Sequence, residues 1–425
     1  MNPLNEIQEM NFGVTCTTSR MFIIAMALIS SLVLAFPQKG SAQELPQTIY
    51  WSGVGFVGNS ADKEARSPHL AEWVDQVGLA ELSMMAWEKL QQVERQDIRL
   101  TMDLGRVKSG NAIAMALALD FEQINAVYIS PIDSMCASNA QIYAQILFFD
   151  MTEGKLLSSF PLHSKRIRDC EGATDELSAE KAEQWISDLM SGEGESLLNV
   201  LPQAYSTLPL NRGFEFNIRV REVKLGKYTE AALGEAGIGK HAYSRWLAAQ
   251  VTSNLSARAG IPVLPFSLGQ AISSKMKVSF SEGSATQIKI PPADFVIDLV
   301  ARGYIKKAGK ETPARVVNTY IFGLGVSVID PMLDEVFFDE NLQFWETRTE
   351  NKADGIPPWE GFERQTITGL RTLFDQFAEP DKKWAQMYVK NLRDKKTSWK
   401  KVRSALLRVE GEVFGKIRGD GVTEL

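Results

Sequence analysis

The sequence predicts an α+β protein with two related α/β sandwich-like domains, each a mixed sheet with helices packed on one face, plus a C-terminal basic helix. Residues 141–163 have the pattern of two strands joined by a tight turn, and residues 320–345 repeat it more loosely. Asp150 and Asp330, which open the two turns, are 180 positions apart. The predicted helices cluster at fixed points instead of alternating one for one with strands, which favours a mixed or antiparallel sheet.

Length and composition suit two globular domains. The chain has 425 residues, of which 44% are hydrophobic and 23% charged. This length exceeds one ordinary domain, and the composition excludes wholesale disorder. The predicted segments are a signal peptide at 1–42, a first α/β domain at 43–208, a second at 209–378 and a basic helical extension at 379–425.

The first 42 residues have the pattern of a secretory signal. Arg20 precedes a 16-residue apolar run, residues 21–36, and small residues follow up to Ala42. A transmembrane anchor is the alternative, but it needs about 20 apolar residues. No Cys lies directly after the run, so the residue that carries the lipid of a lipoprotein is missing. We expect cleavage after Ala42 and a periplasmic protein that is not a lipoprotein.

The cysteines predict one disulfide. Cys16 lies in the leader, which leaves Cys136 and Cys170 as the mature pair, and disulfides persist outside the cytoplasm. With a turn centred on residue 152, the numbers of opposed residues sum to about 304, and those of the two cysteines sum to 306. The sulfurs are therefore expected just beyond the open end of the hairpin, where a bond stabilises the fold by roughly 3 kcal/mol. Two unrelated buried thiols are the alternative.

The first half is expected to run from strand to helix to strands to hairpin to helix. Leu70, Trp73, Val74 and Val77 recur at i, i+3, i+4 and i+7, the spacing of a core-facing helix face. In the hairpin, Asp150 and Gly154 supply turn chemistry. The predicted elements are strands at 48–57 and 98–104, one or two strands within 112–129, helices at 68–90 and 177–205, and a polar loop at 58–67.

The second half repeats this order after the turn-forming residues 209–213. Its helix carries Trp246, Leu247 and Val251 on one side, and a polar stretch rich in Ser and Lys, residues 269–292, is expected as a loop. The predicted elements are strands at 214–223, 261–266 and 293–305, a helix at 241–258, the second hairpin, and a helix after Pro358.

The C-terminal extension is predicted as a basic amphipathic helix. Residues 382–408 hold ten Lys or Arg against Asp394 alone, in a chain with a formal net charge of −6. The apolar residues step by three or four: Trp399, Val402, Leu406, Val409 and Val413. A surface helix docked on the body by these residues is one interpretation, and a contact with anionic lipid or an acidic partner is the other. Export argues against nucleic acid.

Catalytic and cofactor motifs are missing from the sequence. Residues 234–241, GEAGIGKH, fall one residue short of a phosphate-binding loop, which requires Ser or Thr after the Lys, so they are interpreted as a loop entering a helix. His69, His163 and His241 lie far apart, and no HExxH or nucleophile elbow occurs. We therefore assign no catalytic, cofactor or metal-binding residue and expect no cofactor.

Two alternatives to a binding protein remain open at this point. Asp294 and Asp298 lie on a predicted strand, as Asp120 does in the first half, and paired carboxylates are the acid and base of an exported hydrolase. An edge position or a salt bridge to Arg302 is the structural alternative. A periplasmic protein that binds a small apolar ligand between its halves, with Trp51, Trp73 and Trp246 as lining, is the third hypothesis, although aromatic residues at helical spacing are more often core.

The first hairpin resembles the small α/β domain of several bacterial envelope assembly proteins. The stretch ILFFDMTEGKLL, residues 146–157, is a strand ending in Asp, a Thr-containing turn with Gly, and a return strand. It is similar to the amino-terminal domain of the Tol-system β-propeller protein, the curli secretion lipoprotein, the lipoprotein activators of peptidoglycan synthases, and the middle domain of the flagellar T-ring protein. The likeness covers residues 45–205 and, more faintly, 214–378. This chain lacks the lipoprotein Cys and the propeller repeats of some members.

The resemblance implies a binding and assembly component and not an enzyme. We therefore expect a non-enzymatic periplasmic adaptor whose two α/β domains contact cell-envelope proteins. Loops carry recognition when a rigid sheet positions them, so residues 59–66, the loop around Cys136 and residues 269–292 are the expected contact elements. The sequence does not define the oligomeric state.

Overall fold

Five strands of the first half and two of the second, β7 and β8, form a seven-stranded sheet, sheet A. The computed structural model describes residues 46–57, 60–103, 112–130, 135–170, 179–208, 216–266, 275–279, 285–352 and 358–419, so the predicted signal peptide at 1–42 lies outside it. The strand order is β2-β1-β3-β4-β5-β8-β7, and β7 also pairs with β1. The strands are β1 (Gln47–Val57), β2 (Ile98–Thr101), β3 (Ile113–Ser130), β4 (Met135–Asp150), β5 (Lys155–Cys170), β7 (Lys275–Ser279) and β8 (Ala285–Lys289).

Both faces of sheet A are covered. Ile142 and Ile146 on one face of β4 and Tyr143 and Leu147 on the other are each at most 3% exposed. One face packs on helices of the first half, because these present apolar residues at helical spacing. The other face is covered partly by β8 and partly by a helix of the second half, α8 (Lys240–Ala259). The first-half helices are α2 (Ser60–Arg66), α3 (Pro68–Val77), α4 (Leu79–Leu90), α5 (Ala179–Ser191) and α6 (Leu197–Thr207).

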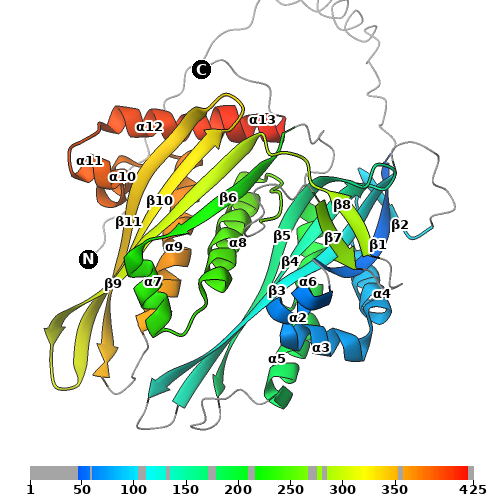
Figure 1. Cartoon of the computed structure of the whole chain (residues 1–425), viewed down its shortest axis with the longest axis horizontal. Helices are drawn as coiled ribbons and strands as arrows, with labels where there is room; N and C mark the ends of the chain where they lie inside the picture. Colours follow the sequence, from blue (N-terminus) through cyan, green and yellow to red (C-terminus); the bar gives the residue numbers. More distant parts are fainter. Residues whose placement is uncertain are drawn as a thin grey trace, which may run out of the picture. The chain divides into compact units, whose positions relative to one another are not determined.

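The second half forms a four-stranded sheet, sheet B, with helices on one face (Figure 1). Its order is β11-β10-β9-β6, with β6 parallel to β9 and the other pairs antiparallel. The apolar face packs on α8, α9 and the C-terminal helices. The strands are β6 (Ile218–Leu225), β9 (Phe295–Glu311), β10 (Arg315–Asp330) and β11 (Glu335–Asn351). The helices are α7 (Lys227–Glu235), α8, α9 (Pro358–Ala378), α10 (Lys382–Tyr388), α11 (Lys390–Arg393), α12 (Trp399–Arg408), the π-helical segment η4 (Val409–Phe414) and α13 (Gly415–Arg418).

The two halves repeat one strand register. In the first half, β1 is parallel to β3, and β4 and β5 follow as antiparallel strands. In the second half, β6 is parallel to β9, and β10 and β11 follow as antiparallel strands. Gln145 pairs with Pro161 as Gly325 pairs with Asn341, a constant offset of 180 positions along both strands of the hairpin. The bulge next to Phe148 recurs next to Val328. The predicted fold class, α+β with mixed sheets and helices, is therefore confirmed.

The two hairpin turns share their hydrogen bonds as well. Asp150 Oδ1 accepts from the backbone N of Thr152 and Glu153, at 2.6 and 2.9 Å. Asp330 Oδ1 accepts in the same way from the two corresponding residues, at 2.8 and 3.0 Å. The fifth residue of each turn has positive φ, +60° at Gly154 and +53° at Asp334. The predicted role of Asp150 as a turn-forming residue is confirmed.

Four local expectations are wrong. Residues 261–266, predicted as a strand, form only an isolated bridge from Val263 to Ile218. The predicted polar loop at 58–67 contains helix α2. The predicted loop at 269–292 contains β7 and β8, which form a ribbon that pairs with β1 and β5 of sheet A. Cys136 belongs to β4 and not to a loop, because the hairpin continues further than the sequence pattern indicated. The pairing of β7 and β8 depends on contacts distant in sequence, which a polar composition does not reveal.

Helix α9 lies against sheet B at two glycines. A Cβ added at Gly369 would lie 2.5 Å from the ring of Phe344, which is 1% exposed. A Cβ at Gly361 would be equally close to the ring of Tyr320. Alanine is the better helix former by about 1 kcal/mol, so these glycines are retained for close packing and not for helix propensity.

We predict that Gly369→Ala lowers the free energy of unfolding by about 1–3 kcal/mol, because overpacking outweighs the gain in helix propensity. Urea denaturation followed by circular dichroism measures the change. Gly234→Ala in α7 is the control, since nothing lies within 4 Å of its added Cβ. An unchanged or higher stability of the Gly369 variant would contradict the close packing.

Candidate functional site

The predicted carboxylate pair is not a site. Asp294 Oδ2 accepts a hydrogen bond from the backbone N of Asn217 at 2.7 Å. Asp298 forms a bidentate pair with Arg221, whose Nε lies 2.9 Å from Oδ1. The expected partner, Arg302, instead donates to the side chain of Asn341. Because each carboxylate has its own structural partner, the hydrolase hypothesis loses its acid and base.

The three tryptophans of the small-ligand hypothesis are core residues. Trp51 and Trp73 belong to the core of the first half, and Trp246 belongs to that of the second. They are between 1% and 6% exposed. The indole N–H of Trp51 donates to the backbone O of Ser83. The prediction that they line a shared cleft is wrong, because Trp246 lies in a different core from the other two and all three rings are buried.

The phosphate-loop candidate is a helix entrance, as predicted. Residues before it form helix α7 and not a buried strand, and Gly239 is the N-cap residue of α8. Within the described residues, no group of three or more His, Cys, Asp or Glu side chains is suited to hold a metal ion.

The predicted cysteine pair matches the strand register. Cys136 and Cys170 are directly opposed Cα partners in the β4–β5 ladder. Their side chains lie outside the described part of the structure, so the disulfide itself stays a prediction.

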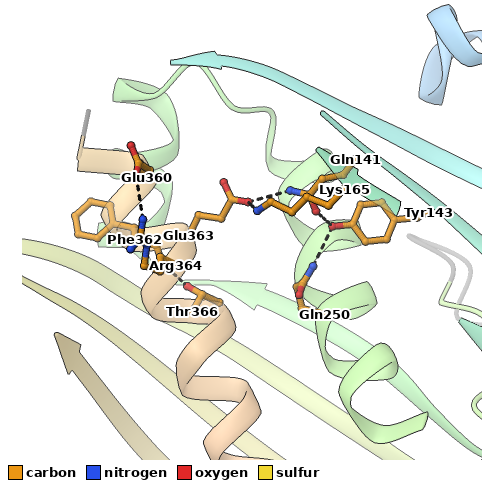
Figure 2. A network of polar contacts seen from close by, with 9 residues as sticks. All are labelled: Gln141, Tyr143, Lys165, Gln250, Glu360, Phe362, Glu363, Arg364 and Thr366. Atoms are coloured by element: carbon orange, nitrogen blue, oxygen red, sulfur yellow. Dashed lines mark hydrogen bonds and ion pairs between the residues drawn. The ribbon is translucent and has the colours of Figure 1, made fainter. Parts of the chain in front are cut away.

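A buried polar cluster joins the two halves (Figure 2). Glu363 of α9 is 6% exposed and accepts from Gln141 Nε2 at 3.0 Å, with Lys165 Nζ at 3.5 Å. The phenol of Tyr143 donates to Gln141 and accepts from Gln250 Nε2 of α8 at 2.9 Å. Strands β4 and β5 of sheet A are thereby bonded to helices α8 and α9 of the second half.

Burial sets the protonation of this junction. It raises the pKa of the Tyr143 phenol, which therefore stays a donor at neutral pH. It also lowers the pKa of His163, whose ring stacks on that of Tyr143 with centroids 6.0 Å apart, and Lys165 adds to this effect. The groups hydrogen-bond one another across the two halves, so the cluster is suited to hold the halves together.

A second buried group, Asp120, lies beside this junction. It is the unpaired residue of a bulge in β3, and its oxygens accept from Arg66 Nη1 at 3.0 Å and Gln145 Nε2 at 3.2 Å. Burial raises the pKa of Asp120, while Arg66 and Arg245 oppose the shift. The adjoining cavity has a volume of about 30 Å³, which holds one or two waters but no larger ligand.

The face of sheet B opposite α8 and α9 carries a much larger hollow, which we name the sheet B groove. Its volume is about 610 Å³. Gly323 leaves its floor without a side chain, whereas Tyr228 of α7 packs over Gly303, where an added Cβ would lie 2.7 Å from the Tyr228 Cβ. Ile305 in its wall is 45% exposed. The lining residues are Gly226, Lys227, Tyr228, Val300, Arg302, Gly303, Ile305, Ile321, Gly323, Asn341, Leu342, Gln343 and Lys390.

The sheet B groove is cationic. Lys227, Arg302 and Lys390 line it, and its lining contains no Asp or Glu. Lys227 Nζ lies 4.8 Å from the centroid of the Tyr228 ring, and Arg302 donates to Asn341, so neither of these contacts neutralises a charge. An apolar floor with a cationic wall suits an acidic amphipathic segment of a partner protein.

The repeated strand register identifies the positions of sheet A that correspond to this groove of sheet B. Gly323 occupies the position of Tyr143, and Arg302, the bulge residue of β9, that of Asp120. In sheet A these positions face α8: Tyr143 bonds Gln250, and Asp120 shares a cavity with Arg245. The sheet B groove is therefore the counterpart of a surface that, in sheet A, holds a helix.

The C-terminal extension is docked on the body. Val402, Leu406, Val409 and Val413 of the predicted apolar stripe are at most 1% exposed and belong to the core of the second half. The basic side chains of residues 382–403 are exposed, and Arg408 pairs with Glu335 and Glu412. A contact of these charges with anionic lipid or an acidic partner stays a prediction.

The chain matches no protein-family model, and no curated protein is significantly similar to it. Across the described residues, no helix has the length and apolar character needed to span a membrane.

The sequence did carry a signal for the groove. Glycines at 303, 323 and 325 interrupt otherwise apolar strands, and glycine inside a strand marks a place where another chain or ligand comes close. The junction had no such signal, since Gln141 and Glu363 are 222 positions apart and are ordinary surface residue types.

We predict that Tyr143→Phe lowers the free energy of unfolding by about 1–3 kcal/mol, because the buried amide of Gln250 loses its acceptor. Thermal and urea unfolding measure the effect. Tyr228→Phe removes the same hydroxyl from a side chain that is 58% exposed and should leave stability unchanged within about 0.5 kcal/mol. Equal stability of the two variants would show that the junction contributes nothing.

Proposed function

We propose that this chain is a non-enzymatic adaptor or assembly protein of the periplasm that binds a cell-envelope protein through the sheet B groove. The observation that carries the proposal is the cationic groove on the face opposite α8 and α9, at the register positions where sheet A holds a helix. The partner that fits it offers an acidic helix with an apolar stripe. The resemblance of the first hairpin to envelope assembly domains supports the same class of function.

The periplasmic location rests on the leader pattern of residues 1–42 and on the predicted disulfide. The direct opposition of Cys136 and Cys170 in the strand register supports that bond. No cofactor or catalytic residue enters the proposal, because each candidate carboxylate, Asp294 and Asp298, has a structural partner.

We predict that Cys136 and Cys170 are oxidised in the protein recovered from the periplasm. Intact mass after alkylation should show no adduct without reductant and two adducts with it. Cys136→Ser is the control, since it leaves Cys170 free to take one adduct without reduction. Two adducts on the unreduced parent protein would refute both the bond and the argument for an oxidising compartment.

Site-specific photocrosslinking tests the groove itself. A benzophenone amino acid at Ile321 or Gln343, in the lining, should crosslink to a partner in intact envelopes. The same residue at Lys307, an exposed position outside the groove lining, should not. Arg302→Glu should reduce the Ile321 crosslink at least tenfold, because it places an acid opposite an acidic partner.

Mass spectrometry of the crosslinked peptide decides the kind of partner. The proposal requires a net acidic helical segment at the Ile321 and Gln343 positions. Failure to crosslink at both positions, or crosslinks to a basic or uncharged segment, would refute binding through the groove.

A further inference from the structure

Helix α4 packs on the first strand of its half, as α8 does in the second. The two strands are β1 for α4 and β6 for α8, and each helix follows its strand in the chain. In α4, the core side carries Leu82, Ala86 and Leu90, each at most 1% exposed. The outer side carries two exposed acids and an exposed apolar residue at helical spacing, Glu81, Met84 and Glu88, with Met84 42% exposed.

We propose that the sheet B groove of one chain binds the outer face of α4 of a second copy, so that copies associate head to tail. The inference rests on the proposed function, since it names the partner of the same groove. The acidic and apolar side of α4 is the complement of the cationic and apolar lining.

The contact inside each chain supplies the precedent. On sheet A, the acid Asp120 lies beside the cation Arg245 of α8. On sheet B, the corresponding strand position is the cation Arg302, and α4 presents the acids Glu81 and Glu88. Both pairings join opposite charges, but the signs are exchanged between sheet and helix. The cationic groove therefore disfavours α8, which presents Arg245, and favours α4, which presents acids.

The geometry of association follows from where the two surfaces lie. The groove belongs to sheet B, and α4 is fixed to sheet A by bonds such as that from the Val54 backbone N to Ser83 Oγ, 2.8 Å. A contact between two different surfaces is heterologous, so each added copy leaves a free groove at one end and a free α4 at the other. Such contacts build rings or filaments, or a two-fold dimer when the groove of each copy holds α4 of the other.

Charge reversal in two places tests the inference with the exported chain. Arg302→Glu with Lys390→Glu changes the groove, and Glu81→Lys with Glu88→Lys changes the helix. Sedimentation over a concentration series should show dimers or larger species for the parent chain. Each variant alone should associate at least tenfold more weakly.

Mixing the two variants gives the sharper result. The intact groove of the helix variant fits the intact α4 of the groove variant, and the two altered surfaces have exchanged charges, so an equimolar mixture should associate like the parent although neither variant does so alone. A chain with all four substitutions should regain self-association, because both charges are exchanged. Lys307→Glu with Lys310→Glu, exposed and outside the groove lining, is the control and should associate like the parent. Circular dichroism checks that every variant is folded.

Other outcomes separate the two proposals. A parent chain that stays monomeric at all concentrations, or variants that associate as the parent does, would refute the head-to-tail contact. If the Ile321 crosslink then identifies an acidic helix of a different protein, the adaptor function stands without this partner. If the Ile321 and Gln343 positions give no crosslink at all, both proposals fail.

Discussion

The buried carboxylate of Glu363 constrains how the two halves of the protein meet. A carboxylate that is 6% exposed is costly unless it is paired and hydrogen-bonded, and its partners Gln141 and Lys165 come from strands of the other half. Helix α9 must therefore face β4 and β5 in one orientation. The phenol of Tyr143 and the amide of Gln250 extend the same requirement to α8. Apolar packing alone tolerates sliding, whereas this hydrogen-bonded set fixes the register between the halves.

The same junction explains why corresponding faces of the two sheets, which share one strand register, have different neighbours. Sheet A presents Asp120 and Tyr143 to α8, and the remainder of that face is covered by the ribbon of β7 and β8. That ribbon follows α8 in the chain yet pairs with strands of sheet A. Sheet B has glycine where sheet A has Tyr143, and arginine where sheet A has Asp120. Its corresponding face therefore lacks both the side chains and the cover that the first half uses.

Local signals in the sequence predicted local structure well. The turn chemistry of Asp150 and its echo at Asp330 located both hairpins, and the sum of residue numbers gave the opposition of Cys136 and Cys170. The spacing of apolar residues and the residues at the helix starts predicted the positions of α3, α8 and α9. Two of the misses have a common cause: β7 and β8, and the partner of Asp298, depend on residues far away in the chain, and neither polarity nor periodicity encodes such pairings. For the same reason, carboxylates on a strand suggested an acid–base pair where the structure has a salt bridge with Arg221.

A face that is covered in one half and open in the other needs a physical explanation. An isolated sheet with one open face is stable when that face is polar, but Val300, Ile305 and Ile321 place apolar area beside Lys227 and Arg302. If solvent were the only neighbour, polar residues would serve better at these three positions, and a side chain at Gly323 would favour the strand more than glycine does. Gly303 is accounted for within the chain, because Tyr228 packs over it. Gly323 and the mixed apolar and cationic lining are instead the features that permit another backbone to come close. The first half shows the outcome of such an approach, since there the corresponding strand positions are buried against a helix.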